Sequence, residues 1–277
     1  MLMTVLSGDE SAYQVTQHQP MKLASMEGLY KGEKRTGITA IGILNPQKQV
    51  GDEQATFLFD FQIPYALSLF GQRSINGFVA GIDDLIYGNP KYSIPPMQER
   101  INSGKIAIQA LKDYKEAKQA GEMKKAQDAY ILLQNNLKNF GYGYFEQPKD
   151  LIPDVPLVFY SFHLMVLLGG WFFVLILSVL YLSMANSIKK FRKLLWACIG
   201  SIPLAYLAVE AGWIVAESGR QPWAIQDLLP VHIAATELSS VNIKISFILF
   251  ALLFSVLLIA EIKIMLTQIK KGFGGEQ

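Results

Sequence analysis

The sequence predicts an all-α membrane protein with three transmembrane helices plus a large extracytoplasmic, mainly helical loop region. The first observation behind this fold class is composition: 51% of the 277 residues are hydrophobic and only 17% are charged, whereas charged residues approach a quarter of an average soluble protein. The second observation is distribution. Residues 1–154 are mixed in polarity, whereas apolar runs of about 20 residues, the length that crosses a bilayer, recur from residue 155 onward.

The N-terminal residues 1–6 are apolar but too short to span a bilayer, and they lack the basic start and the cleavage site of a signal peptide. We interpret them as the end of a truncated transmembrane helix. The net charge of +2 comes without a basic block, which excludes nucleic-acid binding because that function needs clustered Lys and Arg. The single cysteine, Cys198, can form neither an internal disulfide nor a cysteine metal cage.

Residues 7–154 are expected to form the extracytoplasmic region. A stretch rich in Gly and Pro ends near residue 96, and residues 97–140 then show the apolar spacing of a helix. An Ala-Gly pair at residues 120–121 interrupts that spacing, which predicts a helical hairpin. Prolines between residues 148 and 156 return the chain to the membrane.

Three segments are long and apolar enough to be transmembrane helices: 157–185, 194–216 and 245–266. Their orientation follows from short loops, because Lys and Arg near the ends of spans are retained in the cytoplasm. The first link and the C-terminus are basic, so region 155–277 is predicted to have a cytoplasmic C-terminus, and residues 7–154 to lie outside. The basic residues are Lys189, Lys190, Arg192, Lys193, Lys270 and Lys271.

The strongest local signal is the segment Glu-Ser-Gly-Arg-Gln-Pro-Trp at residues 217–223, where the second span meets the outer face. An acid at a membrane boundary costs free energy unless it is paired, ligated or hydrated, which favours a functional role. Arg220 can neutralise a carboxylate or a haem propionate. Glu210 and Trp213 share the helical stripe of Glu217. The alternative is a helix-end ion pair with Trp223 as an interfacial residue.

A second candidate lies in the first span, where Met165 precedes a Gly-Gly pair at residues 169–170. A thioether can bind haem iron, and glycines one turn further on let a flat macrocycle approach the backbone. The alternative is that Met165 only packs, as a methionine in a membrane helix usually does. His163 is a rival ligand, but it lies on another face of the helix.

The third cluster follows the first apolar segment and contains Lys22 and Glu27. These residues supply a cation and a general base close to the membrane surface, where a quinol head group would present hydroxyl protons. Their spacing places them about 140° apart around an α-helix, so they would reach one ligand only from different sides. The alternative is a pair of solvated charges on an amphipathic helix.

Together the three clusters resemble subunit I of the cytochrome bd-type quinol oxidases, in the order and topology of that family. The resemblance covers essentially the whole chain but only the C-terminal portion of the family, from the quinol-binding loop onward. The most specific match is Gly-Arg-Gln-Pro-Trp at 219–223, after a helix containing Trp213 and Glu217. Gly-Asp-Glu-Ser at 8–11 and Gln-Pro-Met-Lys-Leu-Ala at 19–24 match the start of the quinol-binding loop.

The resemblance implies a role for each candidate residue. Lys22 and Glu27 would serve quinol oxidation, and Met165 would be an axial ligand of the low-spin haem b. Glu217 would be a ligand or close neighbour of the high-spin haems, with its neighbours Trp213 and Arg220 in the same site. The implied cofactors are low-spin haem b, high-spin haem b, and haem d or a further haem b. The family passes electrons from quinol to oxygen and makes water.

The sequence departs from the family pattern because the N-terminal helices are absent, and His18, His163 and His232 do not match the missing haem ligands. It also carries a long insertion at residues 38–154. The implied partners are the missing N-terminal half of subunit I, subunit II, quinol, oxygen and the lipid bilayer of the bacterial inner membrane. Two alternatives stay open: a haem-free membrane anchor that presents an extracytoplasmic helical binding domain, and an inactive fragment. Ubiquinol and menaquinol are both compatible with the sequence.

Overall fold

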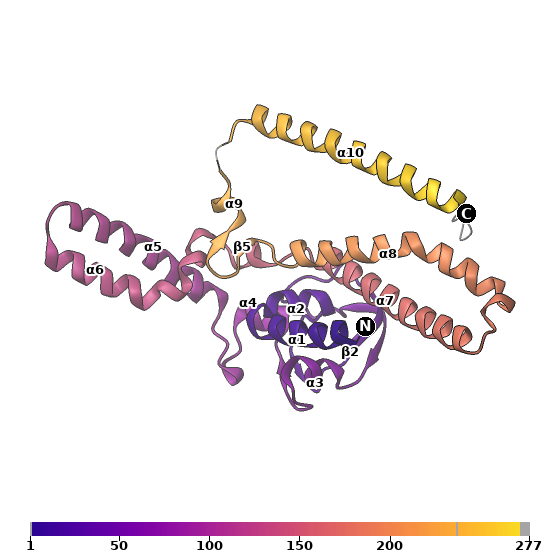
Figure 1. Cartoon of the computed structure of the whole chain (residues 1–277). Coiled ribbons are helices and arrows are strands. Elements are labelled where there is room, and N and C mark those ends of the chain that lie inside the picture. Colours follow the sequence, from indigo (N-terminus) through magenta and orange to yellow (C-terminus); the bar gives the residue numbers. More distant parts are fainter. Residues whose placement is uncertain (1, 237, 272–277) are drawn as a thin grey trace. The chain divides into compact units, whose positions relative to one another are not determined.

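Figure 1 shows the computed structural model of the chain, in which residues 2–236 and 238–271 are described. Residue 1 of the predicted segment 1–6 therefore lies outside the described residues. So do residues 237 and 272–277 of the predicted region 155–277. The chain divides into two units, Met1–Ala234 and Ala235–Gln277. Each unit is described by itself.

The described residues contain three helices long and apolar enough to cross a membrane. They are α7 (Val155–Met184) and α8 (Arg192–Ser218) in the first unit, and α10 (Ser240–Lys271) in the second. The prediction of an all-α membrane protein with three spanning helices is confirmed. Helices form here because every backbone polar group finds its partner within the segment, which an apolar surrounding demands.

Helices α7 and α8 form a side-by-side pair joined by a short basic turn, η4 (Ile188–Lys190). The Asp154 side chain caps the start of α7 by accepting a hydrogen bond from Leu157 N at 3.0 Å. Within the pair, Trp171 Nε1 donates to Ser201 Oγ at 2.9 Å. This bond satisfies two polar groups that would otherwise face an apolar environment.

The chain before α7 begins with two helices, α1 (Leu2–His18) and α2 (Pro20–Glu27). Helix α1 continues past residue 6, so the segment interpreted as a helix end belongs to a helix of 17 residues. Pro20 stands in the first turn of α2, where its missing N–H leaves no bond unmade. Gly28 then ends α2 at φ 62°, a backbone conformation that favours glycine.

A β-hairpin follows, and the sequence analysis did not predict it. Strand β2 (Ile38–Leu44) pairs antiparallel with β3 (Phe57–Ile63), and the register is interrupted between Thr39 and Ile41. The remaining short elements of the first unit are β1 (Glu33–Lys34), α3 (Ala66–Gln72), β4 (Phe78–Val79), α4 (Ile82–Tyr87), η1 (Pro90–Tyr92), η2 (Leu137–Tyr144), η3 (Pro148–Leu151), β5 (Trp223–Ile225), β6 (Leu229–Pro230) and α9 (Val231–Ala234).

The predicted helical hairpin is confirmed as α5 (Met97–Gln119) and α6 (Met123–Asn136), which lie side by side in Figure 1. The turn between them contains Gly121 at φ 75°. Helix α5 also packs against η2, where Gly104 and Gly143 meet. A Cβ added at Gly104 would lie 2.3 Å from the backbone nitrogen of Gly143, so only glycine permits this approach.

Replacing Gly104 with Ala is expected to destabilise the hairpin against η2 by about 1–3 kcal/mol, because backbone atoms must separate to admit the methyl group. The measurement is the rate at which a protease cleaves the hairpin in native membranes. Gly8→Ala is the control, since no atom lies within 4 Å of the added Cβ. Equal cleavage rates for the two variants would contradict the tight packing.

One hydrophobic core joins the loop elements to the start of α7. Helices α2, α4, α5 and α7 all contribute to it, and so does β2. The core therefore fixes the loop region against the end of α7 at which the chain enters this helix. Its residues are Ala24, Tyr30, Leu44, Ile82, Ile86, Met97, Ile101, Tyr142, Phe145, Leu151, Val155, Phe159 and Trp223.

Candidate functional site

Lys22 lies on α2 and reaches the C-terminal end of α8. Its Nζ donates to the carbonyl oxygen of Ala216 at 3.4 Å. Burial lowers the pKa of the Lys22 ammonium, the positive charge of Arg220 lowers it further, and the charge of Glu217 acts in the opposite direction. A Cβ added at Gly219 would lie 3.1 Å from Lys22 Cγ, so the glycine gives the lysine side chain room.

Glu217 and Arg220 form an ion pair at the end of α8, with Arg220 Nη2 donating to Glu217 Oε2 at 2.7 Å. The Glu217 side chain is 51% exposed. Trp213 is exposed on the same helix, and so is Glu210. The predicted stripe of acids with a tryptophan is therefore an open face of α8 in the first unit.

Glu27 lies at the end of α2 and is buried, with 4% of its surface exposed. Its Oε2 accepts a hydrogen bond from Thr39 N at 3.2 Å. Burial raises the pKa of the Glu27 carboxyl to about 7, and the Thr39 N–H opposes that rise by stabilising the charged form. A carboxyl group that titrates near neutral pH can remove a proton from a bound ligand.

A cavity of about 330 Å³ lies beside Glu27. Glu27 and Thr39 line it, together with residues of the loop that follows α2. Two of its lysines are already paired: Lys31 Nζ lies 2.9 Å from Glu53 Oε2, and Lys48 forms an ion pair with Asp52. The lysines are thus neutralised locally, and Glu27 is the buried acid at the cavity wall.

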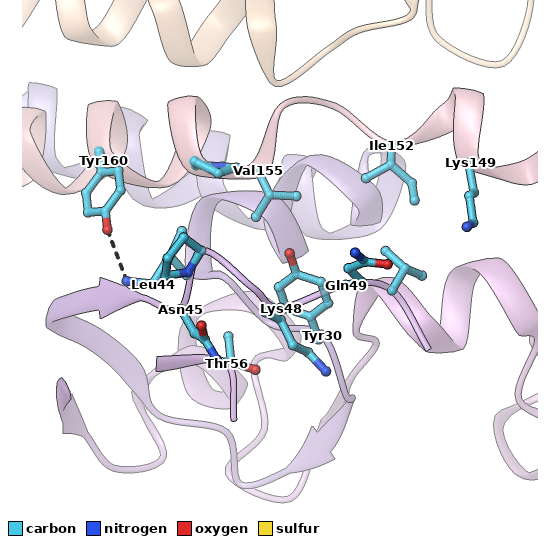
Figure 2. Close-up of a pocket in the computed structure, with 13 residues that line it drawn as sticks. Tyr30, Leu44, Asn45, Lys48, Gln49, Thr56, Lys149, Ile152, Val155 and Tyr160 are labelled. Atoms are coloured by element: carbon cyan, nitrogen blue, oxygen red, sulfur yellow. Dashed lines mark hydrogen bonds between the residues drawn. The ribbon is translucent and has the colours of Figure 1, made fainter. Parts of the chain in front are cut away.

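A neighbouring cavity of about 380 Å³ lies between β2 and the start of α7 (Figure 2). Tyr30, Lys48 and Thr56 line both cavities, so these side chains form the wall between them. On the α7 side, the Tyr160 hydroxyl accepts a hydrogen bond from Leu44 N at 3.0 Å, drawn as a dashed line in Figure 2. This bond holds the end of β2 against α7.

Met165 lies on α7, one half of the paired helices, and is partly buried. A Cβ added at Gly212 of α8 would lie 3.2 Å from the Met165 sulfur, so the thioether faces α8. His163, the rival ligand, contacts backbone carbonyl oxygens with both ring nitrogens: Nδ1 lies 2.8 Å from Phe159 O and Nε2 lies 2.6 Å from Thr39 O. Both ring nitrogens of His163 are therefore occupied by backbone contacts.

The structure brings some of the predicted residues together and keeps others apart. Lys22 joins Glu217 and Arg220 at the end of α8, a grouping that the sequence analysis did not predict. Glu27 contacts β2 instead, so Lys22 and Glu27 lie against different elements. Thr39 was missed by the sequence analysis, because its contribution comes from backbone atoms that any residue type could supply.

The fit of haem groups can be judged from the side chains present. Arg220 Nε is a buried donor without a partner among the described residues, as expected of an arginine that awaits an acceptor such as a propionate. Met165 and Glu217 offer a thioether and a carboxylate, both of which can bind iron. Among the described residues no cluster of His, Cys, Asp and Glu could hold a metal ion without a further group.

Known proteins with similar sequences point to one family. The family model described as cytochrome bd terminal oxidase subunit I matches residues 1–273. Subunit 1 of the cytochrome bd-II ubiquinol oxidase of Escherichia coli (strain K12) is 30% identical over 279 residues, which cover 95% of this chain and 51% of the relative. Subunit 1 of the cytochrome bd ubiquinol oxidase of Bacillus subtilis (strain 168) is 24% identical over 269 residues, covering 96% and 45%.

A solved structure has the same fold. The bd oxidase of Geobacillus thermodenitrificans superposes with a TM-score of 0.58 at 23% identity, covering 98% of this chain and 46% of that one. The chain spans about half the length of the curated relatives it matches. Because the family model matches nearly every residue, the chain belongs to the family of cytochrome bd terminal oxidase subunit I, a family of membrane oxidoreductases, and its partial coverage of the relatives is consistent with the predicted C-terminal portion.

Proposed function

We propose that this chain supplies the quinol-oxidising loop and one wall of the haem sites of a bd-type terminal oxidase. The enzyme couples quinol oxidation at the outer membrane face to haem-based reduction of oxygen to water. The single observation that carries this proposal is Glu27, whose buried carboxyl group lies at a cavity wall with a pKa of about 7. The relatives support the substrate class, because two of them are named as ubiquinol oxidases.

Quinol oxidation requires a group that removes a hydroxyl proton as electrons leave the ring. Glu27 in its ionised form would accept this proton, and its pKa near neutrality matches that task. Lys22 would act from the other side of the head group, because an ammonium stabilises the negative charge that develops on the oxygen. Among the described residues, the hydrogen bond of Lys22 Nζ is to Ala216 O, which leaves further N–H groups for a ligand.

The haem groups would supply the electron transfer between quinol and oxygen. Met165 is proposed as an axial ligand of the low-spin haem b. Glu217 is proposed as a ligand or neighbour of the high-spin haem b and of the haem d, or further haem b, at the oxygen site. Arg220 would hold a propionate with its Nε donor, which has no partner in the described part of the chain, and Trp213 would line the same site from α8.

The proposed topology places residues 7–154 outside and the C-terminus in the cytoplasm of a bacterial inner membrane. Lys22 contacts the C-terminal end of α8, at Ala216. The basic turn that carries Lys189 and Lys190 precedes the opposite end of this helix. The proposed quinol loop and the basic turn therefore lie at opposite ends of α8, which agrees with a loop outside and a cytoplasmic turn.

The proposed partners are the N-terminal half of subunit I, subunit II and the surrounding lipid. The relatives are about twice as long as this chain, and their remaining half would provide the facing walls of the haem sites. The exposed face of α8 with Glu210 and Glu217 supports this assembly, because carboxylates are costly against lipid unless another protein segment or water covers them.

A reduced-minus-oxidised spectrum, combined with quinol-driven oxygen uptake, tests the proposal. The membranes come from a strain without another terminal oxidase and contain this chain with the rest of subunit I and subunit II. We expect haem bands and oxygen uptake. The same membranes with this chain alone should take up no oxygen, because the resemblance puts the second axial ligand of the low-spin haem outside it.

The alternatives predict other results. A haem-free anchor for an extracytoplasmic binding domain would show no haem bands that depend on this chain. An inactive fragment would leave oxygen uptake unchanged when it is omitted from the complex. Robust uptake by this chain alone would show that it is a complete enzyme and would contradict the proposed division of the haem sites.

A further inference from the structure

Strand β2 is held against helix α7 by two side chains of the helix. Tyr160 accepts a hydrogen bond from Leu44 N at 3.0 Å, at the C-terminal end of the strand. His163 contacts the carbonyl oxygen of Thr39 at 2.6 Å, near the N-terminal end of the strand. These two contacts join segments that are more than a hundred residues apart in the chain, with sequence separations of 116 and 124.

The imidazole of His163 is held in one orientation. Its ring lies against the ring of Phe159, with centroids 3.9 Å apart, and Phe159 is fully buried. A carbonyl oxygen can only accept a hydrogen bond, and a neutral imidazole has one N–H. His163 donates to Thr39 when this N–H is on Nε2, which lies 2.6 Å from Thr39 O, whereas Nδ1 lies 2.8 Å from Phe159 O.

Thr39 links this histidine to Glu27 through its own backbone. Its carbonyl oxygen accepts from His163, and its N–H donates to Glu27 Oε2 at 3.2 Å. Thr39 pairs with Gln62 of β3, and the register of the β2–β3 pair shifts directly after it, between Thr39 and Ile41, so regular pairing supports Thr39 on one side only. The contact from His163 of α7 adds a second restraint on Thr39 at this irregularity.

We propose that His163 is a positioning residue for quinol oxidation, which holds the backbone of Thr39 so that the Thr39 N–H stays on the Glu27 carboxylate. This inference rests on the proposed function, in which Glu27 removes the quinol proton. His163 acts only as a hydrogen-bond donor in this scheme and touches neither substrate nor iron. The helix that carries Met165 thereby also sets the environment of the proposed base.

Other titratable groups surround Glu27, and none of them competes with Thr39 for its carboxyl group. No hydrogen bond or ion pair among the described residues joins any of these groups to Glu27. Its environment is therefore dominated by burial and by the Thr39 N–H. The surrounding groups are Tyr30, Lys31, Glu33, Lys48 and Glu53, which line the same cavity, and His163 of α7, which contacts the other side of Thr39.

The test is the pH profile of quinol oxidation by the assembled oxidase, with rates expressed per haem. The two main variants are His163→Asn and His163→Gln. The Asn amide can take the place of Nδ1 but cannot reach Thr39, whereas the longer Gln amide can take the place of Nε2. For His163→Asn we expect the midpoint of the pH–rate curve to rise above about 7 by roughly half a pH unit or more, because the Glu27 carboxylate loses the hydrogen bond from Thr39 N–H. His163→Gln should keep the wild-type midpoint.

Tyr160→Phe is the matched control, because it removes the other contact between α7 and β2 without touching Thr39. It should keep the wild-type midpoint. A fall of the midpoint in His163→Asn would overturn the inference, since it would mean that a loosened strand lets water reach Glu27. The inference would also be overturned if His163→Asn kept the wild-type midpoint. An equal shift of the midpoint in His163→Asn and Tyr160→Phe would overturn it too, because the effect would then not be specific to Thr39.

Glu27→Gln separates this inference from the proposed function. If the pH-dependent limb disappears in Glu27→Gln but stays in place in His163→Asn, Glu27 is the base and only the role of His163 is wrong. If Glu27→Gln keeps the wild-type profile, the proposed base is wrong and the inference falls with it. Both the proposed base and the role of His163 are supported if the rise of the rate with pH depends on Glu27 and its midpoint shifts to higher pH only when the contact to Thr39 is lost.

Discussion

Replacing Glu27 with Gln is expected to lower the rate of quinol oxidation by about 10²- to 10⁴-fold, the usual contribution of a general acid or base. The amide keeps the size of the side chain but cannot accept the quinol proton. The haem bands should persist, because Glu27 faces β2 and the loop cavity and not the face of α8 proposed for the high-spin haems. Quinol-driven oxygen uptake by the assembled oxidase, normalised to haem, measures the effect.

The pH dependence gives a second measurement on the same variant. Because the pKa of Glu27 is raised to about 7, the active ionised form accumulates as the pH rises through neutrality, and the wild-type rate should rise with it. This limb should be absent in Glu27→Gln. Glu99→Gln, an exposed acid on α5 outside the cavity, is the control with the same change of charge. Near-normal turnover in Glu27→Gln would refute the base.

Replacing Met165 with Leu is expected to remove or shift the low-spin haem band of the assembled oxidase while the other haem bands persist. The thioether sulfur is the ligand atom in the proposal, and leucine has nearly the same volume, so packing is maintained. Electron transfer from quinol to oxygen should then fall sharply, because the haem groups are proposed to carry it. The measurement is a reduced-minus-oxidised spectrum of membranes with matched amounts of subunit I.

Met184→Leu provides the control for this variant. It makes the same chemical change on the same helix, but Met184 is the last residue of α7 and is 77% exposed. Its spectrum should match that of the wild type. If Met165→Leu also kept the wild-type spectrum, the sulfur would be a packing atom against Gly212, and the low-spin haem would need another ligand.

The sequence by itself determined the elements that have a local signature. Long apolar runs identified α7, α8 and α10 because a helix that crosses a bilayer needs about 20 apolar residues in one segment. Apolar spacing with an Ala-Gly break identified the hairpin of α5 and α6 because both signals lie within a few turns. The motif at residues 219–223 identified the family, because a short, specific motif can be read without knowing the fold.

Only the tertiary structure decided which of the chemically important groups meet. Lys22 lies 194 residues before its partner Ala216, and Thr39 lies 124 residues before His163. Contacts at such separations depend on how strands and helices dock, and periodicity carries no information about docking. The burial that brings the pKa of Glu27 near 7 arises in the same way. The sequence around Glu27 is compatible with a solvated charge on an amphipathic helix, and only the folded loop region, in which Thr39 of β2 contacts the carboxyl group, buries it.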